Sequence, residues 1–217
     1  MFAVPHPTRD RWRWFPLSEM KLGRGVWRDT SLVTNLDSDS VPRSDWPADG
    51  VLGVEKLAEA DVVMDFPRRR LELHPRGSLA RRPLENPAYR VHLLWSILTV
   101  TTRIQDRVCT LVVHTGSGGS YFSSEFAAKL KGLDTSRRAM ISTVEGARLM
   151  STLTLPELSL GGYTARGVTF GILEGNPALA VPVSSIDGVI GRDILGHCRL
   201  TQREGGKSVR FEPPNRK

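Results

Sequence analysis

The fold of this chain is best inferred from the segment Cys109-Thr110-Leu111-Val112-Val113-His114-Thr115-Gly116-Ser117-Gly118-Gly119-Ser120. Its first five residues are apolar or β-branched, which favours a strand, and the glycines that follow cannot continue one. His114 stands where the strand gives way to the turn. The pattern therefore predicts a buried strand that delivers one titratable side chain into a glycine-lined loop.

Three interpretations of this loop remain open from the residues alone. The first is a strand that ends in a flexible loop, with His114 satisfied or exposed. The second is a phosphate-binding loop, although neither G-x-x-x-x-G-K-[ST] nor G-x-G-x-x-G is present. The third is nucleophilic catalysis with His114 activating Ser117 or Ser120, for which no third group that would orient the histidine is identifiable.

Composition gives a chain of 217 residues that is 40% hydrophobic, enough to bury a core in one large or two small domains. The formal net charge of +7 makes nucleic acid a partner to consider. The basic residues cluster only at 68–70 and 81–82, where no aromatic residue interleaves them. A solvated linker is the favoured interpretation, and no nucleic-acid partner is predicted.

The cysteines and histidines predict no cofactor. Cys109 and Cys198 are too few for a disulfide framework, and a single bridge between them is left open. The five histidines have no metal-ligand spacing, so no metal site is predicted.

No segment predicts a membrane anchor. The longest apolar stretch, 91–100, is too short and too polar to span a bilayer, and Met1 is not followed by the pattern of a signal peptide. As written, the sequence predicts a cytoplasmic protein without a membrane partner.

An internal repeat relates two distant segments. Residues 17–75 and 155–213 align without a gap at a shift of 138 positions. Asp49-Gly50-Val51-Leu52-Gly53 then falls on Asp187-Gly188-Val189-Ile190-Gly191. Two copies of one pattern predict two similar lobes.

Each copy predicts the same order of elements. A strand pair turns at Leu22-Gly23 in the first copy and at Gly161-Gly162 in the second. A short helix follows, over 54–60 and 192–197, and a second strand pair closes each copy, over 61–66 with 71–74 and over 199–203 with 208–212.

The segment between the two copies predicts further strands. Residues 92–104 and 108–113 read as a hairpin across Gln105-Asp106-Arg107. Ser123 or Ser124 is expected to cap a helix over 125–131 that Gly132 ends. Residues 140–155 alternate polar and apolar around Glu145-Gly146, which predicts another hairpin.

Leu111-Val112-Val113-His114-Thr115-Gly116-Ser117 resembles the hydrophobic-hydrophobic-Asp-Thr-Gly-Ser motif of pepsin- and retropepsin-like aspartic peptidases, with His114 in the place of the aspartate. The segment 187–195 is similar to the one that completes the ψ-loop beneath the catalytic loop in that family. The resemblance implies an all-β, pepsin/retropepsin-like barrel, in which the hairpin at 140–155 would be the flap that covers substrate.

The same resemblance implies a division of the chain. It gives an N-terminal extension at 1–16, a partial first lobe at 17–75, a linker at 76–88 and a complete second lobe at 89–213. Because the front half of the first lobe has no counterpart in the sequence, we expect the natural start to lie upstream of Met1, where an export signal would also be placed.

The family's chemistry requires two facing carboxylates that share one proton. An imidazole cannot form such a dyad, so the resemblance implies an aspartic endopeptidase homologue that is inactive or incomplete as written. The implied catalytic positions are His114, Thr115 and Gly116, and the implied substrate-binding residues are Ser117, Glu145 and Gly146. The alternative is a non-catalytic peptide-binding module.

The expected partner is a peptide or protein, and the expected state is a monomer or a homodimer. A nucleic-acid-binding β-domain is the least favoured interpretation.

Overall fold

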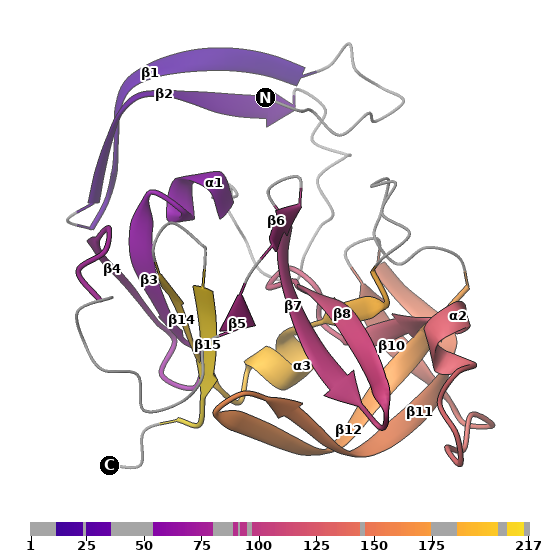
Figure 1. The fold of residues 1–217 in the computed structure, drawn as a ribbon. Helices are drawn as coiled ribbons and strands as arrows, with labels where there is room; N and C mark the ends of the chain where they lie inside the picture. Colours follow the sequence, from indigo (N-terminus) through magenta and orange to yellow (C-terminus); the bar gives the residue numbers. More distant parts are fainter. Residues whose placement is uncertain are drawn as a thin grey trace. The chain divides into compact units, whose positions relative to one another are not determined.

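The computed structural model describes residues 12–23, 25–35, 54–79, 89–90, 92–94, 97–143, 146–174, 186–203 and 208–214. It divides the chain into two units, Met1–Val51 and Leu52–Lys217. Strands dominate both units, and each of the three helices among the described residues is four residues long (Figure 1). The predicted all-β class is confirmed. No described helix is long and apolar enough to cross a membrane.

The first unit contains a two-stranded antiparallel hairpin. It is made of β1 (Trp12–Leu22) and β2 (Gly25–Asn35), with Leu22 opposite Gly25. Gly23 has a φ of +58°, in the left-handed region that glycine adopts without a steric penalty. The turn predicted at Leu22-Gly23 is therefore confirmed.

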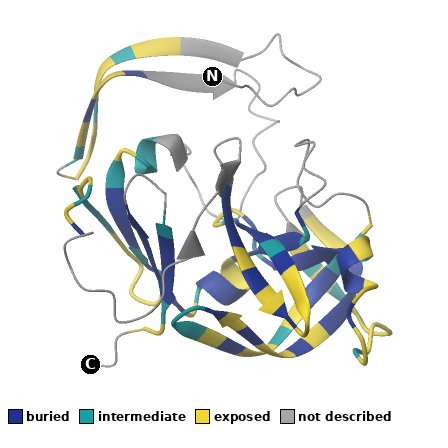
Figure 2. Cartoon of the chain, viewed as in Figure 1, coloured by how far each residue is buried: buried dark blue, intermediate teal, exposed yellow. Residues whose placement is uncertain are grey.

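The second unit contains an eight-stranded sheet in the order β10-β11-β12-β9-β13-β8-β7-β6. Buried and exposed residues alternate along β7 after residue 100, as the pleat of a half-buried strand requires (Figure 2). Thr102 on β7 donates a hydrogen bond to the Ser159 carbonyl on β11 at 2.7 Å, which joins two strands distant in the sheet order. This bond brings β7 and β11 together. The strands of the sheet are β6 (His92–Leu94), β7 (Ile97–Ile104), β8 (Arg107–Val113), β9 (Tyr121–Ser123), β10 (Arg138–Thr143), β11 (Gly146–Leu160), β12 (Tyr163–Leu173) and β13 (Gly188–Ile190).

The short strand β13 lies between β8 and β9, which precede it in the chain. It is parallel to β8 and antiparallel to β9. A late strand inserted between two earlier neighbours forms the ψ-loop expected for residues 187–195. Gly188 makes this insertion possible, because a Cβ there would lie 2.5 Å from the Tyr121 carbonyl oxygen.

Two sequence predictions need correction. Residues 92–104 form two strands, not one, because Leu94 pairs with Ile97 and the chain reverses between them. The helices are shorter than expected: α1 is Val54–Leu57, α2 is Ser124–Ala127 and α3 is Arg192–Leu195. The hydroxyl of Ser123 caps α2 by accepting from the Phe126 N–H at 3.1 Å, so Ser123 is the cap.

A five-stranded sheet in the order β4-β3-β14-β15-β5 completes the second unit. One of its faces is apolar, and Leu200, Val209 and Phe211 on that face are fully buried in the core shared with the larger sheet. The neighbouring strands β3 and β14 are antiparallel, with Val63 opposite Thr201. The strands are β3 (Ala60–Asp65), β4 (Arg70–Pro75), β5 (Tyr89–Arg90), β14 (Arg199–Arg203) and β15 (Ser208–Glu212).

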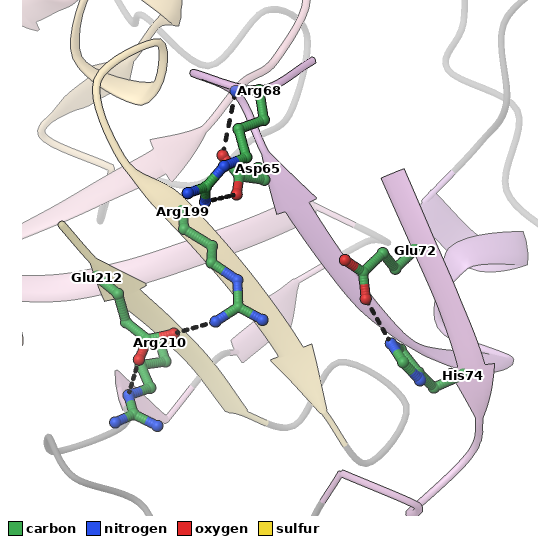
Figure 3. A network of polar contacts seen from close by, with 7 residues as sticks. All are labelled: Asp65, Arg68, Glu72, His74, Arg199, Arg210 and Glu212. Atoms are coloured by element: carbon green, nitrogen blue, oxygen red, sulfur yellow. Dashed lines mark hydrogen bonds and ion pairs between the residues drawn. The ribbon is translucent and has the colours of Figure 1, made fainter. Parts of the chain in front are cut away.

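The other face of this sheet carries ion pairs (Figure 3). Glu212 accepts from Arg199 at 3.5 Å and lies 3.3 Å from the Nε of Arg210. Asp65, buried like Arg210, pairs with Arg68 at 2.9 Å. Buried charges need such partners, because an unpaired charge in the interior is strongly unfavourable.

Both cysteines are buried and free. Burial raises the pKa of the Cys198 thiol to about 12. The pKa of Cys109 is raised by burial and, to a lesser degree, by the Asp187 carboxylate. Both side chains therefore belong to the apolar core as neutral thiols, and the bridge left open by the sequence is absent.

Candidate functional site

The site loop, His114–Ser120, follows directly on β8. The His114 N–H donates to the Ile190 carbonyl at 3.0 Å, and its own carbonyl accepts from the Ser117 N–H at 3.2 Å. The first bond comes from β13, so the ψ-loop holds the histidine backbone at the edge of the buried strands. The structure thus places His114 where the sequence predicted a titratable side chain.

The His114 imidazole is held by its own loop. Its Nδ1 accepts from the Gly116 N–H at 3.1 Å. A neutral imidazole has one donor and one acceptor nitrogen, so this bond leaves the proton on Nε2. Burial lowers the pKa of His114 below its usual 6.5, which favours the neutral ring near pH 7.

This lowered pKa predicts a loss of stability in acid. The unfolded chain takes up the proton near pH 6.5 and the folded chain only at lower pH, so the free energy of unfolding falls as the pH drops below about 6.5. His114→Gln does not titrate and keeps an acceptor for Gly116. Urea unfolding between pH 7.5 and 5 should therefore show a smaller acid loss for His114→Gln than for the wild type. An equal loss in both would contradict the assignment.

Helix α3 fastens the far end of the site loop. The Asp193 carboxylate accepts from the Ser120 N–H at 2.8 Å and from the Ser120 hydroxyl at 2.6 Å. The same hydroxyl accepts from the Gly191 N–H at 2.9 Å, and the Arg192 N–H donates to the Ser117 carbonyl at 2.8 Å. Ser120 is fully buried, so these bonds satisfy groups that water cannot reach.

A second carboxylate ties the ψ-loop together. Asp187 Oδ2 accepts from the Thr110 N–H at 2.8 Å. The Asp187 N–H donates to the Thr110 carbonyl, and the Asp187 carbonyl accepts from Ser123, both at 2.8 Å. Asp187 is thus hydrogen-bonded to the backbone of β8 and β9 and supports the strand that ends directly before His114.

The predicted site residues have different environments. Thr115 and Gly116 are exposed at the turn. Ser117 is fully buried, and its hydroxyl donates to the Gly119 carbonyl at 2.7 Å. Glu145 lies outside the described residues, and Gly146 begins β11 opposite Thr143.

The hairpin β10–β11 contacts the site loop. The Gly119 N–H donates to the Ser142 carbonyl of β10 at 2.8 Å. Gly118 and Gly119 permit this approach, because a Cβ on either would come within 3 Å of Ser142 or Ile141 side-chain atoms. The structure therefore brings a strand of the predicted hairpin onto the predicted loop.

The hydroxyls in the loop are directed away from the histidine. Ser120 donates to Asp193 and Ser117 to a loop carbonyl, while His114 Nδ1 is occupied by Gly116. This arrangement does not favour a serine nucleophile activated by His114. No cluster of metal-ligating side chains occurs among the residues that the structure describes.

Sequence reasoning missed the bonds between Ser120 and Asp193. Asp193 belongs to the segment 187–195 that carries the resemblance, but the sequence pattern gives its carboxylate no role. The signal was a carboxylate two residues after Gly191, which becomes informative once the ψ-loop places it under the glycine-rich loop.

A strand that ends in a Thr-Gly loop, with an inserted strand and a short helix bonded to that loop, is the arrangement that the resemblance to pepsin- and retropepsin-like peptidases predicts. The family model described as aspartyl protease matches residues 100–194. The matched segment runs from β7 to α3, and over this range the chain is similar to the aspartyl protease family.

A search of the curated proteins finds no match. A retropepsin-like aspartic protease from Rickettsia conorii is among the similar solved structures, with 13% identity and a TM-score of 0.35, over 52% of this chain and 83% of that chain.

Proposed function

We propose that this chain is an aspartic-peptidase-like protein that binds peptides without cleaving them by the aspartic mechanism. The observation that carries the proposal is the position of the His114 imidazole. It occupies the aspartate position of the motif, and its Nδ1 accepts a hydrogen bond from the Gly116 N–H at 3.1 Å. The family supports a peptide or protein as the ligand.

The aspartic mechanism needs one ionised and one protonated carboxyl group on either side of a water molecule. His114 supplies neither. The nearby carboxylates, Asp187 and Asp193, accept hydrogen bonds from Thr110 and from Ser120 and Ile194. They act as supports of the loop, so none of them replaces the missing acid.

Peptide binding is supported by the position of the hairpin β10–β11, for which we propose the role of flap. β10 lies at one end of the eight-stranded sheet, and an edge strand can pair with an added peptide strand. Met140 and Leu149 face each other across the hairpin, with 61% and 53% of their surfaces exposed. Such an apolar pair offers contacts to the side chains of a bound peptide.

We also propose that the chain is built from two copies of one half-lobe, residues 17–75 and 155–213, within the divisions predicted from sequence. At the shift of 138 positions, β1 and β2 correspond to 150–160 of β11 and to the whole of β12. α1 corresponds to α3, residue for residue.

The internal geometry of the two hairpins supports the duplication. Asp29 and Gly167 are equivalent, and both have left-handed φ angles, of 49° and 61°. The equivalent pairs Glu19–Arg28 and Glu157–Arg166 lie at 3.7 and 3.8 Å. In the five-stranded sheet, the opposed residues Val63 and Thr201 are also equivalent positions, as a two-fold relation between β3 and β14 requires.

The activity is tested with the purified chain, casein and a fluorescent peptide library between pH 4 and pH 8. We expect no cleavage, and we expect a subset of peptides to bind intact, as shown by anisotropy and mass spectrometry. Cleavage that is lost on His114→Ala would overturn the proposal, and so would the absence of any bound peptide.

A further inference from the structure

We infer that His114 donates a hydrogen bond to a carboxylate of the bound ligand, an inference that rests on the proposed peptide-binding function. The acceptor is either the C-terminal carboxylate of a peptide or an Asp or Glu side chain. An aspartate at this position would repel such a group, so the inference reverses the polarity of the site.

The first argument is the direction of the imidazole. The bond from the Gly116 N–H to Nδ1 fixes the neutral ring as the Nε2–H tautomer. The histidine backbone is fixed as well, by Ile190 and Ser117. The loop therefore presents a positioned N–H donor at the point where the family's motif presents an acidic oxygen.

The second argument is the charge around this donor. The oxygens of Asp193, the carboxylate in α3, accept hydrogen bonds from Ser120 and Ile194. Arg192, the first residue of α3, is exposed and forms no ion pair with another described residue. Its backbone N–H donates to the Ser117 carbonyl at 2.8 Å, so its side chain branches from the backbone next to the site loop.

These two features favour an anionic acceptor over a neutral one. A hydrogen bond with an ionised partner is about twice as strong as a neutral one. The half-buried position of His114 strengthens the bond further, because the local dielectric is lower than that of water. A peptide carbonyl would satisfy the donor, but as a neutral group it would gain less than a carboxylate from the charge of Arg192.

The test uses the full chain and an N-terminally labelled octapeptide of alternating Val and Thr in four forms. These are a C-terminal amide, a free C-terminal acid, an amide with a central Gln and an amide with a central Glu. Anisotropy at pH 7.5 should show about tenfold tighter binding for the free acid than for the amide, or for Glu than for Gln. The arm that responds identifies the source of the carboxylate.

Three variants test whether His114 causes the preference for the acid forms of the peptide. His114→Leu, which has no donor, should bring the paired forms to within about twofold, whereas His114→Gln, which keeps an N–H, should retain part of the preference. His197→Leu, at an exposed histidine after α3, should retain all of it.

Equal binding of the acid and neutral forms would overturn this inference and leave the proposed function intact. A preference that survives in His114→Leu would also overturn it. Failure of all four peptides to bind would count against this inference and the proposed function together, and cleavage of any of them would count against the proposed function.

Discussion

Gly191→Ala should lower the free energy of unfolding by about 3 kcal/mol, because the added methyl group has no space. A Cβ at this position would lie 2.4 Å from the Gly119 carbonyl oxygen and 3.0 Å from that of Ser117. Both contacts are with backbone of the site loop, which cannot rotate away as a side chain can. The loop must move, and its bonds to α3 must lengthen or break.

The requirement for glycine at this position comes from the contact, not from the backbone conformation. Gly191 has a φ of −99° and a ψ of −171°, which any residue adopts. Gly132→Ala is the control with the reverse situation: Gly132 has a left-handed φ of +68°, but an added Cβ there would meet open space. We expect that variant to lose only about 1 kcal/mol, from the left-handed φ.

Urea unfolding monitored by tryptophan fluorescence measures both variants. A loss in Gly191→Ala no larger than that in Gly132→Ala would show that the loop yields easily. The close packing of the loop on α3 would then not be what holds the His114 turn in place.

The elements that sequence predicted well are those set by local chemistry. β14 and β15 have the predicted bounds, because alternating residues between turn-forming segments specify a strand pair locally. The turns at Gly23 and Gly161 follow from the left-handed φ of each glycine, 58° and 66°. The order of the strands around the ψ-loop was accessible only through the resemblance.

The elements that sequence did not predict depend on contacts between distant residues. The separation of β6 from β7 is set by their pairing with each other, which an apolar run does not reveal. The bonds from Ser120 to Asp193 join residues 73 positions apart. The tautomer of His114 depends on the turn at Gly116, which brings an N–H to within 3.1 Å of the ring.

Gln202→Met should raise the free energy of unfolding by about 2 kcal/mol. Gln202 is fully buried on the apolar face of the five-stranded sheet, opposite Val62 and Val209. Neither its Oε1 nor its Nε2 has a hydrogen-bond partner among the described residues. A buried polar group without a partner costs about 1–3 kcal/mol, and methionine has nearly the same length and volume.

The proposed duplication is a second, independent reason to choose methionine as the replacement. At the shift of 138 positions, Gln202 corresponds to Met64, which packs against the same core from the neighbouring strand β3. Methionine is therefore the residue that the equivalent position already carries. The substitution would make β3 and β14 more alike on their apolar face.

Gln105→Met is the matched control. The Gln105 amide donates to the Lys131 carbonyl at 2.9 Å and accepts from the Lys131 N–H at 3.1 Å. The same change should lower stability there, because it removes two bonds and buries nothing. Opposite signs for the two variants in urea unfolding would identify the unpaired amide as the cause. A loss of stability in Gln202→Met would instead mean that the amide has a partner in solution, such as a bound water molecule.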